Sequence, residues 1–240
     1  MKILLLLLCL LCQVSLLSQA TFKSRQKYEE AGFILGVTNY SGDIAQKNIH
    51  LSETKLGYGV FARHFFSNKF SVKAHLYAGT LSGDDANSKD PNTKRRSFRF
   101  TTNFAEVGIS GEWHMLGKNR YSSTGIHQRF LSPYLYLGVG GTFSNAKVVY
   151  YGTPEDRNEF IKTPFPEVGQ RQKFLIAPMG VGLRYELNEA LVLGAELGWR
   201  PVFSDDIDGV RLNGNPEKND WYYFGGATLA FIFGKTKSPR

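Results

Sequence analysis

The chain has 240 residues, and 29 Lys and Arg against 21 Asp and Glu give it a formal net charge of +8. Its 25 glycines lie well above the average use of about 7%. After residue 20 no apolar run is long enough for a membrane helix, and no nucleic-acid motif is present, so both of these protein classes are excluded.

Residues 1–20 have the pattern of a secretory signal peptide. Lys2 precedes the continuous apolar run Ile3–Leu11, and small residues lead to a cleavage site after Ala20. Cleavage there removes Cys9 and Cys12, the chain's two cysteines. The mature chain is therefore expected to have neither a disulfide nor a thiolate metal ligand.

The segment Trp221–Phe233 is the clearest strand. Every second residue forms a face that is aromatic at both ends and aliphatic or small between them. This is typical of a strand that crosses a bilayer, where rings lie at the two interfaces. A closed barrel pairs such a final strand with its first one.

Seven further segments alternate in the same way. No helical period appears after residue 20, which indicates an all-β chain. The expected strands are Glu29–Tyr40, Lys55–Phe66, Phe70–Leu81, Phe98–Met115, Leu131–Tyr150, Gln172–Leu187 and Ala190–Phe203. Phe98 and Phe100 lie on the wrong face of their strand, so a bulge is expected near Thr101–Asn103.

Strand number and loop lengths predict an eight-stranded antiparallel up-and-down transmembrane β-barrel in the outer membrane. Long and short connections alternate, except after the fourth strand, which places both termini in the periplasm. The expected parts are a signal peptide (1–20), a periplasmic leader (21–28), the barrel (29–234) and a basic tail (235–240).

One face of the strands carries charges of both signs, and the other is apolar along most strands. With the apolar face on lipid, the charges line the lumen, pair with one another and close it to flow. The alternative is a soluble secreted barrel with its apolar face inside. The predicted lumen network is Glu30, Arg63, Lys73, Glu106, Glu112, Arg184, Glu186, Glu196 and Arg200.

The residues suggest no catalytic site, no cofactor and no metal site. The histidines (His50, His64, His75, His114 and His127) lack zinc-ligand spacing. His50 and Ser52 could be a base and a nucleophile, but a third partner is not evident. Whether the loop carboxylates Asp205, Asp206 and Asp208 bind a cation is left open, since their spacing matches no calcium loop.

Three stretches carry a resemblance to a known family: Gly36–Asp43, Gly198–Asp208 and Asp220–Lys235. Together they resemble the PorG-like outer-membrane barrels of Bacteroidota. The second stretch departs from the usual pattern, because Ser204-Asp205-Asp206 has no aromatic residue between the acids. The family-motif positions are Tyr40, Gly42, Asp43, Arg200, Asp205, Asp206 and Asp208.

The resemblance implies a non-enzymatic part in type IX protein secretion. The partners would be outer-membrane lipids, a periplasmic ring lipoprotein and its soluble partner, and no small-molecule substrate is expected. The alternatives are a stand-alone structural or adhesive barrel, similar to OmpA or OmpX, and a barrel enzyme that acts on lipids.

The connection Leu116–Phe130 is unusually long for a periplasmic turn. It carries Lys118, Arg120, His127 and Arg129, which form the candidate docking surface for an acidic periplasmic partner. A tolerated insertion is the alternative, because additional loop length costs little closure entropy.

Overall fold

The computed structural model describes residues 27–41, 51–88, 91–153, 156, 171–204, 207 and 220–233. The predicted signal peptide, most of the leader and the basic tail lie outside this part of the chain.

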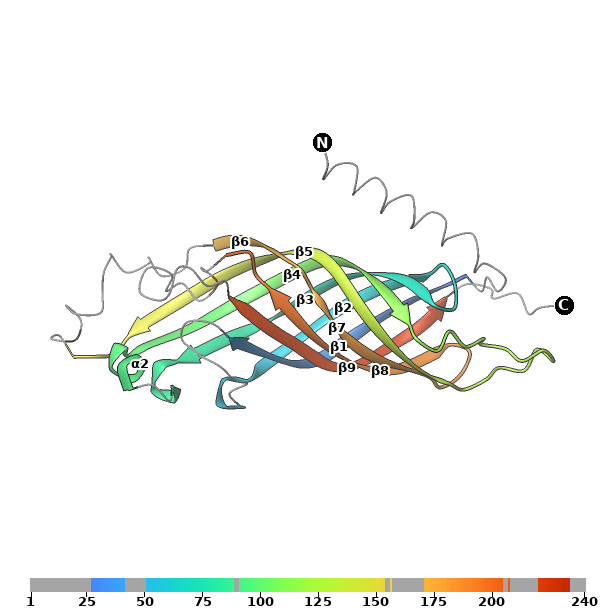
Figure 1. Ribbon diagram of the computed structural model, residues 1–240, viewed down its shortest axis with the longest axis horizontal. Coiled ribbons are helices and arrows are strands. Elements are labelled where there is room, and N and C mark those ends of the chain that lie inside the picture. The colour runs from blue at the N-terminus through green and yellow to red at the C-terminus, as the bar shows by residue number, and fades with distance from the viewer. Residues whose placement is uncertain are drawn as a thin grey trace, which may run out of the picture.

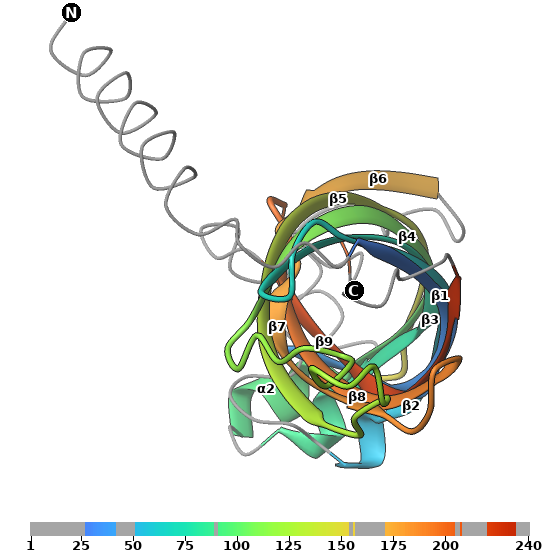
Figure 2. The same ribbon diagram turned by 90° about the vertical axis from the view of Figure 1, so that its right-hand side faces the viewer.

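The described residues form a single closed ring of antiparallel strands (Figures 1 and 2). The ring runs from β1 through β5 in chain order, continues through β7 and β8 to β9, and closes where β9 pairs with β1. The strands are β1 (Tyr28–Ser41), β2 (Lys55–Phe65), β3 (Phe70–Asp84), β4 (Phe98–His114), β5 (Leu131–Tyr150), β6 (Arg171–Ile176), β7 (Met179–Glu186), β8 (Leu191–Pro201) and β9 (Trp221–Phe233).

The ring has eight positions because β6 and β7 both pair with β5, one above the other. The predicted barrel of eight strands is thus confirmed, but the predicted strand Gln172–Leu187 is broken in two at Ala177 and Pro178. Proline has no N–H to give to a ladder. Its carbonyl accepts from Gly138 N at 2.8 Å, and Ala177 N donates to Pro201 O at 3.2 Å, so the break stays bonded to both neighbours.

The apolar face of the strands points outward and the polar face inward. On β4 buried and exposed residues alternate without exception from Phe98 to His114. Large aliphatic side chains are strongly exposed on the outer face, such as Val139 and Leu175 at 72% each. The lumen therefore holds the charges of the central part of the barrel, and exposed charges lie toward its ends.

The predicted bulge near Thr101–Asn103 is wrong. β4 pairs with β5 in an unbroken register from Phe98↔Tyr150 to His114↔Tyr134. Phe98 and Phe100 point into the lumen, where both are 1% exposed. The sequence rule failed because this end of the lumen is filled by aromatic rings instead of charges, so apolar residues on the inward face require no change of register.

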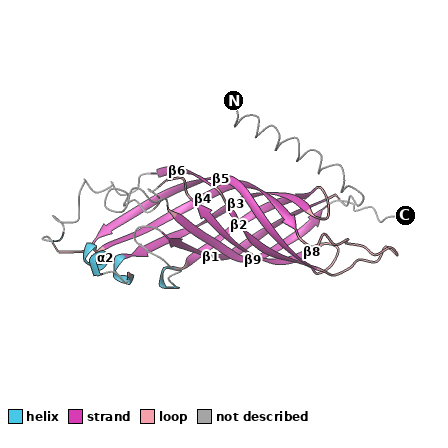
Figure 3. Cartoon of the chain, viewed as in Figure 1, coloured by secondary structure: helices cyan, strands magenta, loops and turns pink. Residues whose placement is uncertain are grey.

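The two ends of the barrel differ. The end at which β1 begins and β9 finishes holds the tight turn between β2 and β3, the short β7–β8 connection and the long connection between β4 and β5 (Figure 1). The opposite end carries short helical segments: η1 (Leu51–Glu53), η2 (Asp85–Asn87) and α2 (Pro91–Arg96) (Figure 3). In the described part of the chain, every helix is too short or too polar to cross a membrane.

Candidate functional site

The lumen is the most chemically specialised region of the molecule. All nine residues of the predicted network are buried in it, at 5% exposure or less. A tenth charge joins them: Arg120, 2% exposed, reaches in from the connection between β4 and β5. With Arg120 this network contains five carboxylates (Glu30, Glu106, Glu112, Glu186 and Glu196) and five permanent cations (Arg63, Lys73, Arg120, Arg184 and Arg200).

The first cluster lies in the lumen at the end of the barrel where β1 begins and β9 finishes. Arg184 from β7 forms ion pairs with Glu30 and, at 2.6 Å, with Glu186. Arg120 Nε lies 3.0 Å from Glu186 Oε2, and His127 Nε2 lies 3.2 Å from the same oxygen. One carboxylate thus anchors the β4–β5 connection to the barrel wall at two points.

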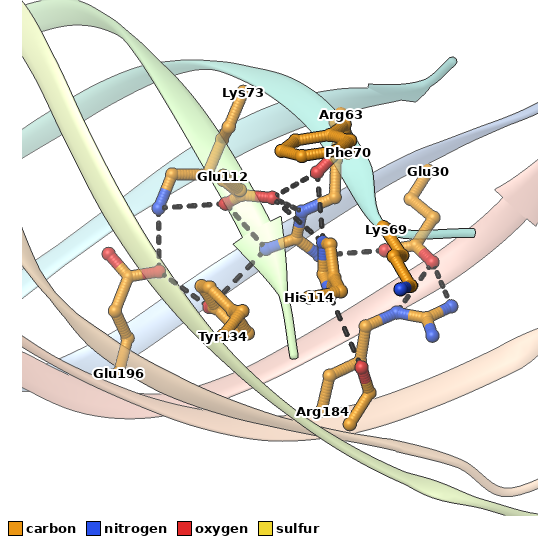
Figure 4. Close-up of polar contacts among 12 residues, drawn as sticks. Glu30, Arg63, Lys69, Phe70, Lys73, Glu112, His114, Tyr134, Arg184 and Glu196 are labelled. Carbon is orange, nitrogen blue, oxygen red and sulfur yellow. Dashed lines mark hydrogen bonds and ion pairs between the residues drawn. The ribbon is translucent and has the colours of Figure 1, made fainter. Parts of the chain in front are cut away.

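The second cluster crosses the middle of the lumen (Figure 4). Arg63 bridges two strands' carboxylates, with Nη1 2.7 Å from Glu30 Oε2 and Nε 2.5 Å from Glu112 Oε2. Lys73 Nζ continues the chain, 3.6 Å from Glu112 and 2.6 Å from Glu196. Because neighbouring links share a carboxylate, the charges form a continuous ladder from one wall to the other.

The third cluster centres on Glu106. Arg200 Nε lies 3.4 Å from Glu106 Oε2, while His75 Nε2 lies 2.8 Å from Oε1. The Tyr222 hydroxyl donates to Glu106 at 2.6 Å, and Arg200 Nη1 donates to the Phe224 carbonyl at 3.2 Å. Glu106 is therefore held by three side chains from three different strands.

Two tyrosines of β5 fill the space between the clusters, and glycines make room for them. The Tyr134 hydroxyl donates to Glu196 at 2.9 Å. A Cβ placed on Gly182 would overlap the Tyr134 ring, and one on Gly198 would overlap the Tyr136 hydroxyl. Glycine at these two positions leaves the space that the two tyrosine side chains occupy.

Aromatic rings fill the lumen toward the end that carries α2. Tyr77 and Phe224 stack with centroids 4.7 Å apart, and Tyr40 packs edge-on against Phe100 at 4.8 Å. Ile207, from the last loop, is fully buried in the same cluster. The described lumen is therefore packed with charge ladders at one end and with rings at the other, which suits a plugged barrel better than a channel.

The last loop is tied to the first strand through Asp220. The Tyr40 hydroxyl donates to Asp220 Oδ1 at 2.6 Å, and Ile207 N donates to Oδ2 at 3.2 Å. Two of the predicted family-motif positions, Tyr40 and Arg200, are thus buried lumen residues. The others, Gly42, Asp43, Asp205, Asp206 and Asp208, lie outside the described residues.

The predicted docking surface needs correction. Residues Leu116–Phe130 form a small hairpin, closed by the bridge between Tyr121 and His127. Arg120 is buried against Glu186 and donates to the Glu189 carbonyl at 2.7 Å, so it cannot face a partner. The sequence placed it on the surface because nothing local distinguishes a cation that folds back into a lumen from one that faces water.

Arg120 is the permanent cation of the described lumen that the predicted network omits. The available signal was the charge count, because the inward face of the predicted strands held five acids and only four bases. A buried carboxylate needs partners, and a fifth cation supplied by a connection balances the five acids.

At the far end, Asp85 organises η2 and α2. Its carboxylate accepts from Arg96 Nε at 3.0 Å and from Phe98 N at 2.9 Å. Burial raises the pKa of Asp85 above its ordinary value, against the opposing effect of Arg96. Among the described residues no group of three His, Cys, Asp or Glu side chains could hold a metal ion.

Several solved barrels resemble the structure weakly. The N-terminal barrel domain of Pseudomonas aeruginosa OprF is 15% identical, with a TM-score of 0.43 over 88% of this chain and 100% of that one. Neisserial surface protein A is 11% identical, with a TM-score of 0.47 over 87% and 97%. The outer membrane protein OprG of Pseudomonas aeruginosa is 11% identical, with a TM-score of 0.42 over 89% and 98%.

Sequence similarity identifies a family but no individual relative. No curated protein matches the chain. The family described as a domain of unknown function, DUF6089, matches residues 2–239, and the chain therefore belongs to the DUF6089 family.

Proposed function

We propose that the protein is a non-enzymatic outer-membrane barrel with a sealed lumen, which serves as a membrane anchor for a periplasmic assembly. The observation that carries the proposal is the inversion of the two faces. Aliphatic side chains cover the outside, while the ten charges are buried inside. A water-soluble barrel has the opposite arrangement, with a polar outer face.

The outer face also has the layered pattern of a membrane barrel. On β4 the outward residues from Ala105 through Val107 and Ile109 are apolar. Trp113 follows them toward the end of the barrel where β1 begins and β9 finishes. Trp221 lies on the outer face toward the other end, at the start of β9. Aromatic residues on both sides of an aliphatic band are typical of proteins that span a bilayer.

The hairpin Leu116–Phe130 gives this anchor a surface for a partner. Its base is fixed by Arg120 and His127, while Lys118, Ile126 and Arg129 remain exposed, Ile126 by 68%. A hairpin that is tied to the barrel wall and exposes one apolar side chain and two cations suits an acidic protein partner, because little ordering entropy is lost on binding.

The resemblance to PorG-like barrels suggests which partner this is. In that family the barrel connects the outer membrane to a periplasmic ring lipoprotein and its soluble partner in type IX secretion. The position of the hairpin, at the same end as the start of β1 and the end of β9, agrees with a periplasmic contact.

The test reverses the two exposed cations and leaves the anchored ones in place. The variant Lys118→Glu/Arg129→Glu and the control Lys55→Glu/Lys94→Glu, at the other end of the barrel, carry the same charge change. After cross-linking in native outer membranes, only the first variant should lose the copurifying periplasmic proteins and the secreted cargo. Equal recovery from both variants would overturn the docking role.

A stand-alone structural or adhesive barrel is the second candidate. It is favoured by β3, β4 and β5, which continue beyond the aliphatic band and carry η2 and α2 between them. Deleting the barrel would then weaken surface attachment of the cells while leaving secretion intact, which is the opposite of the outcome expected for the anchor.

A further inference from the structure

Three exposed cations gather on the outer face of β5 and β6: Lys147, Arg171 and Lys173. In the register of these strands Arg171 lies opposite Asn145, and Lys173 lies opposite Phe143. Lys147 is two residues beyond Asn145 on the same face, so it is diagonal to Arg171. Diagonal neighbours lie about 7–8 Å apart, which places the three cations within reach of one ligand.

The cations begin where the aliphatic band ends. Along β6 the outward series passes from Leu175, 72% exposed, to Lys173. Along β5 it passes from Val139 through Phe143 to Asn145 and Lys147. The Lys173 ammonium lies 5.6 Å from the centroid of the Phe143 ring, so this cation sits at the edge of the apolar surface.

No carboxylate neutralises this cluster within the described part of the chain. None of the three cations makes an ion pair there, and the outward residues of β4, β5 and β6 include no acid. The neighbouring Arg99 differs, because it pairs with Asp84 at 2.6 Å. Three adjacent like charges repel one another, so an anion from outside the chain would stabilise the cluster.

We propose that Lys147, Arg171 and Lys173 bind the phosphate groups of a phosphorylated glycolipid in the outer leaflet. The inference rests on the outer-membrane location proposed above. A separate observation supports it, namely the position of the cluster along the barrel axis. The cluster lies directly beyond the aliphatic band, at the end away from the start of β1 and the finish of β9, where outer-leaflet headgroups would lie. Phosphate suits the site because guanidinium and ammonium groups both bind it strongly.

The test compares binding of three lipids to the folded, detergent-purified barrel by native mass spectrometry. The probes are bisphosphorylated lipid A, the same lipid without its phosphates, and phosphatidylglycerol. The intact barrel should bind bisphosphorylated lipid A most strongly. The variant Lys147→Gln/Arg171→Gln/Lys173→Gln should bind it at least tenfold more weakly, since each cation near a lipid surface contributes about fivefold.

The control variant removes the same amount of charge from other faces, by the substitutions Lys55→Gln, Lys94→Gln and Lys118→Gln. It should bind lipid A as the intact barrel does. Equal binding of lipid A with and without phosphates would overturn the proposal, as would equal losses in both variants. Stronger binding of phosphatidylglycerol would refute the glycolipid as ligand.

Folding is measured separately, by the heat-dependent shift in gel mobility of each variant. If all three proteins fold and insert into vesicles while lipid A binding is unaffected by the triple substitution, only the glycolipid site is wrong. If none inserts, the proposed membrane location is wrong as well.

Discussion

Replacing Lys73 with methionine removes one cation from the charge network of the lumen while keeping nearly the same side-chain volume. Lys73 Nζ lies 2.6 Å from Glu196 and 3.6 Å from Glu112. Glu112 keeps Arg63 as its partner, but Glu196 would keep only the Tyr134 hydroxyl. Removing one member of a buried pair costs about 3–5 kcal/mol, so the ratio of folded to unfolded protein at a given denaturant concentration should fall by a factor of roughly 10²–10⁴.

The second variant, Lys73→Met/Glu196→Gln, tests the reason for that loss. With both charges gone, no carboxylate is left unpaired, and most of the stability should return, to within about 1.5 kcal/mol of the parent. The assay is reversible unfolding by guanidinium in phospholipid micelles, followed by tryptophan fluorescence. If Lys73→Met alone is as stable as the parent, or if Glu196→Gln fails to restore stability, the charge ladder does not hold the lumen together.

Three further changes test other parts of the structure. Arg200→Leu should destabilise the barrel less than Lys73→Met in the same unfolding assay, because His75 and Tyr222 remain bonded to the carboxylate that it leaves; a larger loss would contradict this ranking. Arg120→Gln should make the β4–β5 hairpin cleavable by protease in intact vesicles, while Lys118→Gln should not; equal resistance would show that the buried cation does not anchor the hairpin. Gly182→Val should lower the folded yield, since its side chain would overlap a tyrosine ring, and a yield equal to the parent's would show that the ring can move away.

The strands and their two faces could be predicted from the sequence because alternation with a period of two is a local signal. β5 and β9 begin and end at the predicted residues, Leu131–Tyr150 and Trp221–Phe233. The inward placement of the charges followed from the same alternation, since a charge on one strand fixes the face of every second residue along it.

The errors came from features that local alternation does not contain. The break between β6 and β7 depends on Pro178, whose missing N–H was a signal that the sequence did offer. The position of Arg120 depends on the tertiary path of a connection, and the inward Phe98 and Phe100 depend on how the lumen changes from charged to aromatic along its axis. Both are set by residues far away in the sequence.

The central claim is that the aliphatic outer band lies in lipid and the charged face lies inside. It is tested most directly by lipids brominated at different depths of the acyl chain, which quench nearby tryptophans. The chain's three tryptophans are replaced with phenylalanine, and a single tryptophan is introduced at Val107, on the outer face, or at Phe104, in the lumen. Tryptophan at Val107 should be quenched most by deep bromines, and tryptophan at Phe104 should not be quenched. Equal quenching at the two positions, or none at Val107, would contradict it.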